Sequence, residues 1–351
     1  MQPKVSTQEQ SGRDSASSCV TAKSVPGRVI MPKLLAFVAA AILCASPAMS
    51  QDWPSRPVTV VVPFAPGSTP DVAARMVAER LHAKLGQPFV IENKPGASGN
   101  LGTASIARAE PDGHTIGVSI VGPLALNTLL FAKMPYDPKT ELAPVTVLAS
   151  QPSVLVVSKD LGVKSTEELV ALLKRDASKL NFGSIGNGSL SHLAVEAIAL
   201  KSNARPVHIP YNGSPAAVTA LIRGDVQIAV LPASSVVPQA ETGQIVLLAV
   251  TAVRRSALLP DLPTLAEAGI AGVEVDSWIG LVAPGKTSPA ILAKLEREVR
   301  QVLAEPGIRE KLKVQYMEPV GNASQDFRTL LDTELERWGP IIRANNIKLG
   351  Q

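Results

Sequence analysis

Short apolar runs rich in β-branched residues alternate along most of the chain with stretches in which apolar residues recur at helical spacing. Helices are predicted at 71–86 and 165–176, and the second begins with a capping box formed by Ser165 and Glu168. Strands that alternate with helices predict an α/β fold with mainly parallel sheets. The apolar runs predict strands at 58–64, 88–93, 114–121, 145–149, 153–158, 180–185, 206–211, 226–231, 245–251 and 278–284.

Three predicted helices begin with a hydroxyl residue followed by proline. We expect each hydroxyl residue to be the N-cap and each proline to occupy the first helical position. These starts are Thr69-Pro70, Ser214-Pro215 and Ser288-Pro289. Two of them follow glycine-containing loops, PFAPGSTPD and PYNGSPAA, and a third glycine loop, FGSIGNGSLSHL, leads from a strand into a helix. Such loops are either ordinary capped turns or, at the carboxyl ends of strands, an anion-binding cleft.

The first fifty residues differ from the rest of the chain. Residues 1–30 are polar and lack periodicity, which predicts a non-native or disordered extension, and the true start is either Met1 or Met31. Residues 31–50 have the features of a cleaved signal peptide: a basic start, an apolar run, and small residues before Gln51. The apolar run is shorter than the roughly 20 residues that a membrane span needs, although an uncleaved anchor remains an alternative.

The predicted export would change the composition of the chain that functions. Cys19 and Cys44 both precede the predicted cut, so the mature protein has no cysteine for a disulfide, a thiolate metal site or catalysis. Loss of the leader removes five of 34 Lys and Arg residues and two of 30 Asp and Glu residues, leaving a net charge of +1. A nearly neutral chain without clustered basic residues predicts no nucleic-acid partner.

The sequence offers little support for a catalytic or cofactor-binding motif. The segment GLVAPGKT at 280–287 matches the P-loop pattern, but a helix start at Ser288-Pro289 follows its lysine and Pro284 removes an amide. We therefore predict neither nucleotide binding nor any other cofactor. No nucleophile elbow or paired-carboxylate signature indicates an enzyme. The four histidines lack metal-ligand spacing: His82 is expected on a helix surface, His114 in a structural turn, His192 at a glycine-loop helix start, and His208 in a strand.

Several ordered motifs between Trp53 and the C-terminus resemble the substrate-binding proteins of tripartite tricarboxylate transporters, the TctC/Bug family. They include VTVVVPFAPGSTPD, MPYDPKTELAPVTVLA, GNGSLSHL, PYNGSPAAVTALIRGDVQ, LPDLPTLAEAG and WIGLVAPGKTSPAILAKL. The resemblance implies a type 2 periplasmic binding protein, with two Rossmann-like lobes and a ligand cleft between them. The chain would cross between the lobes near Ser150 and Asp276. Lobe 1 would comprise 51–150 and 277–351, and lobe 2 would comprise 151–276.

The same resemblance implies a function by binding and lobe closure, without catalysis. The protein would act as a monomer that captures a small carboxylate, a di- or tricarboxylate or related organic acid, in the periplasm. It would deliver the acid to the membrane permease subunits of a tripartite tricarboxylate transporter. A ligand-sensing receptor that feeds a membrane signalling protein is the alternative. Trp278, just past the second crossing, would either line the cleft or pack in the hinge, and packing is favoured.

The family's ligand loops map onto three segments of this chain. The implied ligand-binding residues are Ser68, Thr69, Asp71, Gly186, Asn187, Ser189, His192, Asn212 and Gly213. Ser68 stands where the family usually has a second glycine, and Pro70 precedes Asp71, which puts the identity of the substrate in doubt. Asp71 either faces the ligand and accepts a hydrogen bond from it, or is an ordinary first-turn helix residue favoured by the helix dipole.

Overall fold

The computed structural model describes residues 53–344 and 346–349. The predicted extension at 1–30, the signal peptide at 31–50 and the cut before Gln51 lie outside the described residues. Within them, a curled mixed sheet has the strand order β2-β1-β3-β9-β4-β7-β5-β6, and β8 and β10 also pair with β4. The strands are β1 (Val58–Val62), β2 (Phe89–Asn93), β3 (Thr115–Ile120), β4 (Leu142–Ser158), β5 (Asn181–Ser184), β6 (Val207–Pro210), β7 (Ile228–Pro232), β8 (Ile245–Val250), β9 (Asp276–Pro284) and β10 (Glu318–Pro319).

Most helices lie in the intervals between strands, as the alternating pattern predicts, and the last helices follow β9. The α-helices are α2 (Thr69–Leu85), α3 (Asn100–Ala107), α4 (Asn127–Leu130), α5 (Thr166–Asp176), α6 (Leu190–Lys201), α7 (Ser214–Arg223), α8 (Ala233–Glu241), α9 (Pro289–Ala304), α10 (Pro306–Val314) and α11 (Ser324–Ala344). Short turns of helix lie at η1 (Ala97–Gly99), η2 (Gly122–Leu126), η3 (Lys159–Leu161) and η4 (Ala177–Lys179). At the start of α5 the Ser165 hydroxyl accepts from the Glu168 amide at 3.2 Å, which confirms half of the capping box. The Glu168 carboxylate instead accepts from Lys164 N, one residue earlier than the motif requires.

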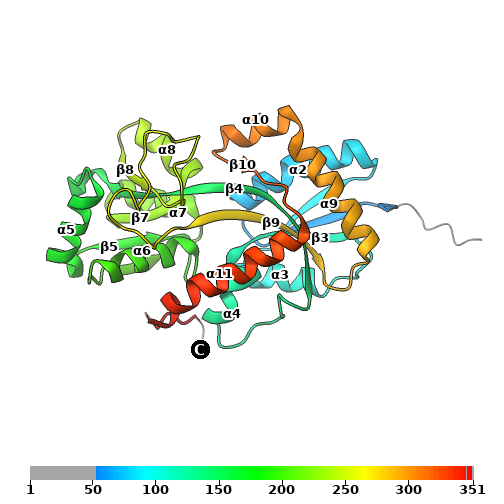
Figure 1. The fold of residues 1–351 in the computed structure, drawn as a ribbon, viewed down its shortest axis with the longest axis horizontal. Helices are drawn as coiled ribbons and strands as arrows, with labels where there is room; N and C mark the ends of the chain where they lie inside the picture. Colours follow the sequence, from blue (N-terminus) through cyan, green and yellow to red (C-terminus); the bar gives the residue numbers. More distant parts are fainter. Residues whose placement is uncertain (1–52, 345, 350–351) are drawn as a thin grey trace, which may run out of the picture. The chain divides into compact units, whose positions relative to one another are not determined.

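The expectation of mainly parallel sheets is wrong for the middle of the sheet. Strand β1 pairs in parallel with β2 and β3, and β5 pairs in parallel with β6 and β7. The long strands β4 and β9 pair antiparallel with each other, and β3–β9, β4–β7, β4–β8 and β4–β10 are also antiparallel. Each parallel set is a doubly wound unit, and the two long antiparallel strands join one unit to the other (Figure 1).

The two strands predicted at 145–149 and 153–158 form one continuous strand, β4. Pro152 makes the sequence read as interrupted, because proline lacks an N–H for the ladder. In the structure Pro152 is the last residue registered with β9, opposite Asp276, and Ser153 is the first registered with β7. The proline therefore lies where β4 changes its pairing partner from β9 to β7. Its missing N–H does not interrupt the strand at this point. The predicted crossings at Ser150 and Asp276, and the lobe boundaries drawn from them, stay predictions.

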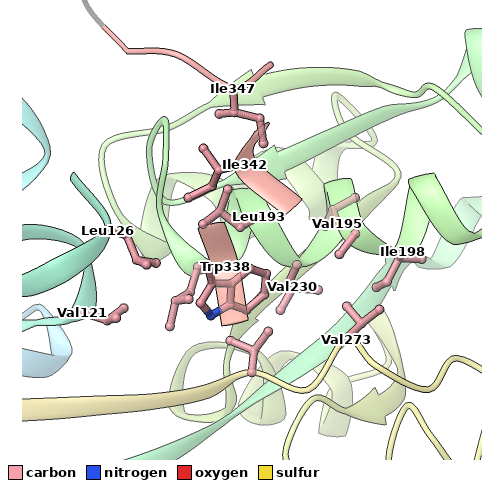
Figure 2. Packing of buried hydrophobic residues seen from close by; sticks show 14 of the residues in the cluster. Val121, Leu126, Leu193, Val195, Ile198, Val230, Val273, Trp338, Ile342 and Ile347 are labelled. Atoms are coloured by element: carbon pink, nitrogen blue, oxygen red, sulfur yellow. The ribbon is translucent and has the colours of Figure 1, made fainter. Parts of the chain in front are cut away.

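Helix α11 packs against elements from both parallel units. Figure 2 shows Trp338 and Ile342 of α11 among Leu193, Val230 and other apolar residues of one hydrophobic cluster. The buried Glu334 carboxylate on the same helix accepts from Trp338 Nε1 at 2.9 Å and from Trp278 Nε1 at 3.3 Å. Trp278 is thus buried in packing, as favoured from the sequence, and it leaves no free face to line a cleft.

Candidate ligand-binding loops

The loop after β1 turns directly into helix α2. Ser68 is the N-cap, with extended backbone at φ −67° and ψ 157°, and Thr69 is the first helical residue. The prediction that Thr69 is the N-cap is therefore wrong by one residue, since Ser68 offers an equally suitable hydroxyl residue with the extended backbone that a cap requires. Within the described part of the chain, the Ser68 hydroxyl oxygen is buried and has no hydrogen-bond partner.

The Asp71 carboxylate anchors this loop through hydrogen bonds. Its buried carboxylate accepts hydrogen bonds from the Gly67 amide at 2.9 Å, from Arg75 Nε and Nη2 at 3.0 and 2.9 Å, and from Asn93 Nδ2 at 2.9 Å. Asn93 Nδ2 also donates to the Phe64 carbonyl at 3.0 Å, so the loop is tied at both ends. Burial alone raises the pKa of Asp71, but hydrogen bonds from Arg75, Gly67 and Asn93 and the Arg75 charge lower it below its ordinary value.

These contacts define what Asp71 does in the structure. Both carboxylate oxygens are occupied by donors of the protein itself, so Asp71 shapes the loop as an ionised anchor. A direct contact between Asp71 and a ligand stays a prediction. The alternative, an ordinary first-turn helix residue, does not account for the hydrogen bonds that Asp71 accepts from residues outside α2.

The loop after β5 contains the second set of expected ligand residues. Gly186 has φ +134°, a conformation that favours glycine, and Asn187 is exposed. Ser189 is the N-cap of α6: its hydroxyl accepts from the His192 amide at 3.2 Å and donates to the Gly186 carbonyl at 2.7 Å. The Ser184 hydroxyl at the end of β5 donates to the same carbonyl at 3.0 Å and accepts from the Gly186 amide at 3.2 Å.

His192 lies under this loop and is buried. Its Nδ1 accepts a hydrogen bond from the Gly188 amide at 3.1 Å, and its Nε2 is 3.6 Å from Glu196 Oε1 on the next turn of α6. The ring stacks on that of His208, with centroids 3.8 Å apart and planes inclined by 7°. Both ring nitrogens of His192 thus face protein groups, and a direct ligand contact by this side chain stays a prediction.

His208 belongs to the same cluster, although the sequence singled it out only as a histidine without metal-ligand spacing. Its Nε2 is 2.7 Å from the Ser184 hydroxyl. Burial, and then the charge of His192, lower the pKa of His208 from 6.5 to about 3. The contact arises because β6 pairs with β5 in a register that sets His208 beside Phe182, whose ring stacks on it at 4.7 Å.

The third expected loop follows β6. Gly213, with φ +98°, is the N-cap of α7, and Ser214 is the first helical residue, so the predicted hydroxyl cap at Ser214 is also wrong by one residue. A glycine fits this cap because its backbone conformation is one that other residues rarely adopt. Asn212 is exposed. A Cβ atom at Gly186 would lie 3.9 Å from the Tyr211 carbonyl, so the second and third loops are neighbours.

A fourth loop, Gly96–Asn100, is missing from the expected site. Gly96, Ala97, Ser98 and Gly99 all have positive φ, including the two non-glycine residues at 47° and 54°. Strained backbone of this kind concentrates at functional sites. The sequence PGASGN after a predicted strand carried the same glycine-loop signal as the other three segments.

The Gly96–Asn100 loop contacts both of the major ligand loops. A Cβ atom at Gly99 would lie 3.0 Å from the Phe64 ring, on the side of the loop after β1. The Ser98 hydroxyl donates to the Asn187 carbonyl at 3.3 Å, on the side of the loop after β5. Asn127 Nδ2 supports the turn by donating to the Ser98 carbonyl at 3.3 Å. The loops from both parallel units therefore form one connected group.

The P-loop match does not form a phosphate-binding loop. Its first five residues, 280–284, lie in β9. The Gly285 amide donates to the Glu141 carbonyl at 2.8 Å, and the Thr287 amide donates to the Pro284 carbonyl at 3.0 Å. Ser288 is the N-cap of α9 and Pro289 its first residue, as predicted. The amides that would surround a phosphate in a P-loop are thus committed to the protein.

No three or more His, Asp or Glu side chains among the described residues are grouped so that they could hold a metal ion. None of the helices in 53–344 and 346–349 combines the length and the apolar character needed to cross a membrane.

The fold and the loop group define a solute-binding protein of the two-lobed periplasmic class. The model of the tripartite tricarboxylate transporter family receptor, TctC, matches residues 73–347. Protein BugT of Bordetella pertussis is 33% identical over 324 residues, which cover 91% of this chain and 99% of BugT. The chain therefore belongs to the TctC/Bug family of periplasmic solute-binding receptors.

Two solved structures are similar over nearly their whole length. Rpa4515 of R. palustris, solved with adipate, is 36% identical with a TM-score of 0.79, covering 83% of this chain and 98% of that protein. MatC of Rhodopseudomonas palustris, solved with bound malate, is 32% identical with a TM-score of 0.76, covering 83% and 100% of the two chains. These similarities confirm the two-lobed binding-protein fold predicted from the motifs.

Proposed function

We propose that the protein is a periplasmic receptor that captures a small dicarboxylate or related organic acid. The observation that carries the proposal is the group of glycine loops, each of which follows a strand of the sheet and leads into the start of a helix. Backbone amides and the helix dipole at such starts favour an anion. The adipate and malate bound by Rpa4515 and MatC support a dicarboxylate as the class of ligand.

Recognition in this proposal uses neutral donors. Arg75, next to the loop after β1, is already paired with Asp71 and is unavailable for a bidentate clamp on the ligand. The buried Ser68 hydroxyl without a protein partner would donate to one ligand carboxylate, together with amides of the same loop. Asn187, Ser189, Asn212 and Gly213 would supply contacts from the loops after β5 and β6.

The mechanism we propose is capture by lobe closure. Lobe 1 comprises 51–150 and 277–351, lobe 2 comprises 151–276, and β4 and β9 link them. A ligand that contacts loops of both lobes stabilises the closed form relative to the open form and so shifts the population toward it. The hydrogen bond from Ser98 to Asn187 joins the two lobes directly and would contribute to the same closed population.

The partner we propose is the membrane permease of a tripartite tricarboxylate transporter, to which the monomeric closed receptor delivers its acid. A sensor protein in the membrane is the second candidate. Crosslinking of the acid-loaded protein in its own membrane fraction, followed by identification of the captured chain, separates the two. Capture of a sensor kinase without a permease subunit would favour the alternative.

A thermal-shift panel on residues 51–351, freed of bound solute by unfolding and refolding, tests the proposal. The panel contains dicarboxylates, tricarboxylates, monocarboxylates, amino acids and Mg-ATP. A ligand at about 100 times its dissociation constant stabilises by about 2.7 kcal/mol, which is readily measured. We expect a dicarboxylate such as adipate or malate to raise the melting temperature. Stabilisation by Mg-ATP or by cationic amino acids, with none by any mono-, di- or tricarboxylate of the panel, would overturn the proposal.

A further inference from the structure

Two stacked imidazole rings support the loop Gly186–Ser189 from below. His192 comes from α6 and His208 from β6, and their rings are nearly parallel at 3.8 Å. His192 reaches the loop directly, because its Nδ1 accepts from the Gly188 amide at 3.1 Å. His208 reaches it through the Ser184 hydroxyl, which bonds to both the amide and the carbonyl of Gly186. The backbone of this ligand loop therefore rests on two titratable rings.

The Gly188 hydrogen bond requires a particular protonation state of His192. A nitrogen that accepts a hydrogen bond has a free lone pair, so Nδ1 is unprotonated and Nε2 carries the ring proton. That proton faces Glu196 Oε1 at 3.6 Å. A second proton would go onto Nδ1, and the Gly188 amide would then meet a donor in place of its acceptor.

Within the described part of the chain, two titratable side chains contact His192. Glu196 faces it from α6, and His208 faces it from β6; Phe182 and Ser184 of β5 and the glycines of the loop itself carry no charge. His208 stays neutral until about pH 3 because burial and the neighbouring ring lower its pKa. The proton-dependent contact that this pair makes with the loop backbone is therefore the one between His192 Nδ1 and the Gly188 amide.

We propose that His192 is a proton-sensitive positioning residue for the ligand loop. The affinity for the captured acid is highest when the ring is neutral and falls when it is protonated. The inference rests on the proposed function, because it concerns the affinity of the same loop for a carboxylate. It adds that uptake by this receptor weakens as the surrounding medium becomes acidic.

The loop is able to respond to such a change. Gly186 has φ +134°, and a Cβ atom there would meet only the Tyr211 carbonyl, at 3.9 Å, so this glycine permits other conformations at low cost. A cationic His192 would by itself attract an anionic ligand. The Glu196 carboxylate, 3.6 Å away, offsets that charge locally, so the lost Gly188 hydrogen bond dominates the effect.

Three variants separate positioning from general structure. His192→Asn places an amide oxygen near the position of Nδ1, where it accepts from Gly188 but does not titrate. His192→Leu removes the acceptor at every pH. His82→Asn is the matched control, since His82 is an exposed histidine on α2. Adipate is the probe, and its affinity is measured by calorimetry at about pH 6 and about pH 8, on either side of the usual histidine range.

We expect adipate to bind about three- to tenfold more weakly to the wild type and to His82→Asn at the lower pH, relative to His192→Asn at the same pH. Comparison at one pH removes the titration of adipate itself, which is common to all variants. His192→Leu should bind weakly at both values. Equal pH dependence in the wild type and in His192→Asn would overturn the proposal.

A measurement without ligand keeps the two proposals apart. In amide-correlated NMR spectra, the Gly188 resonance of the wild type should shift with the same midpoint as the His192 ring, and this shift should disappear in His192→Asn. If Gly188 titrates in this way but adipate and malate bind at no pH, the carboxylate function fails while the coupling of the ring to the loop stands. If the ring titrates and Gly188 does not respond, the positioning role is contradicted.

Discussion

The loops after β1 and β5 both turn a strand into the start of a helix, yet different chemical groups hold them. The loop after β1 is held by the Asp71 carboxylate. Hydrogen bonds keep the pKa of this carboxylate below its ordinary value, so Asp71 is ionised throughout the neutral and mildly acidic range. The loop after β5 rests on His192 and His208, two imidazole rings whose hydrogen bonds depend on which ring nitrogens carry a proton. One half of the candidate site is therefore fixed against pH, and the other half is open to regulation by it.

The largest effect should come from removing the fixed anchor. Asp71→Ala leaves Gly67, Arg75 and Asn93 without their common acceptor, and we expect a loss of about 3 kcal/mol in the free energy of unfolding. Urea unfolding measures it. In the control Arg75→Ala, an ion pair whose arginine side chain is 53% exposed is lost, which should cost about 1 kcal/mol or less. Equal losses in the two variants would show that Asp71 serves only the ion pair.

The space around the two loops also differs. A Cβ atom at Gly188 would lie 2.5 Å from Leu130 Cδ1 and from Leu349 Cδ1, whereas a Cβ atom at Gly67 would meet nothing within 4 Å. Both glycines have positive φ, at 71° and 77°. We expect Gly188→Ala to destabilise by about 2–3 kcal/mol and Gly67→Ala by about 1 kcal/mol in chemical unfolding. A larger effect at Gly67 would contradict the packing described for the loop after β5.

The two N-cap serines should differ in their effect on the stability of the ligand-free protein. Ser68→Ala removes a buried hydroxyl without a protein partner, so we expect about tenfold weaker adipate binding and little change in the ligand-free melting temperature. Ser189→Ala removes a cap that accepts from His192 N, and we expect a loss of about 1 kcal/mol in unfolding free energy. Calorimetry and thermal melts of both variants measure this. Unchanged affinity in Ser68→Ala would place that hydroxyl outside the ligand contacts.

The pH dependence of stability should contain a contribution from His208. The folded protein binds the His208 proton only near pH 3, whereas an unfolded chain binds it near 6.5. Between these values protons favour the unfolded state, so this contribution is complete above pH 6.5 and is lost as the pH falls toward about 3. In His208→Gln, the melting temperature should fall less between about pH 7 and about pH 4.5 than it does in the wild type. Parallel curves would contradict a neutral, half-buried His208.

The local residue pattern was enough to predict most of the strands and several of the helix starts. Apolar patterning located helices α2 and α5 and every described strand except β10, and the glycine and hydroxyl motifs located the starts of α6, α7 and α9. The failures occurred where tertiary context decides. Pro152 reads as a break in the chain, and only the change of strand partner at that point reveals a continuous β4. In Ser68-Thr69 and Gly213-Ser214, either residue is chemically suited to cap the helix, and in the structure the earlier residue of each pair is the N-cap.

The supporting chemistry of the site depends on contacts between distant residues. Asp71 meets Asn93 because β2 pairs with β1 and ends beside the start of α2. His208 meets His192 because β6 is registered beside β5. Sequence spacing contains neither relation, so both the anchored carboxylate and the stacked rings escaped prediction. The loop Gly96–Asn100 carries a recognisable glycine signal, but the ligand loops implied by the family resemblance do not include it.

Hydrogen exchange with and without saturating adipate tests the central claim, that loops from both parallel units bind one carboxylate. The account predicts slower amide exchange in three separate segments at once: residues 67–72, 186–192 and 212–217. Exposed surface helices such as α5 should be unaffected and serve as the internal reference. Stabilisation by adipate with protection confined to one parallel unit, or with none in these three segments, would contradict the account.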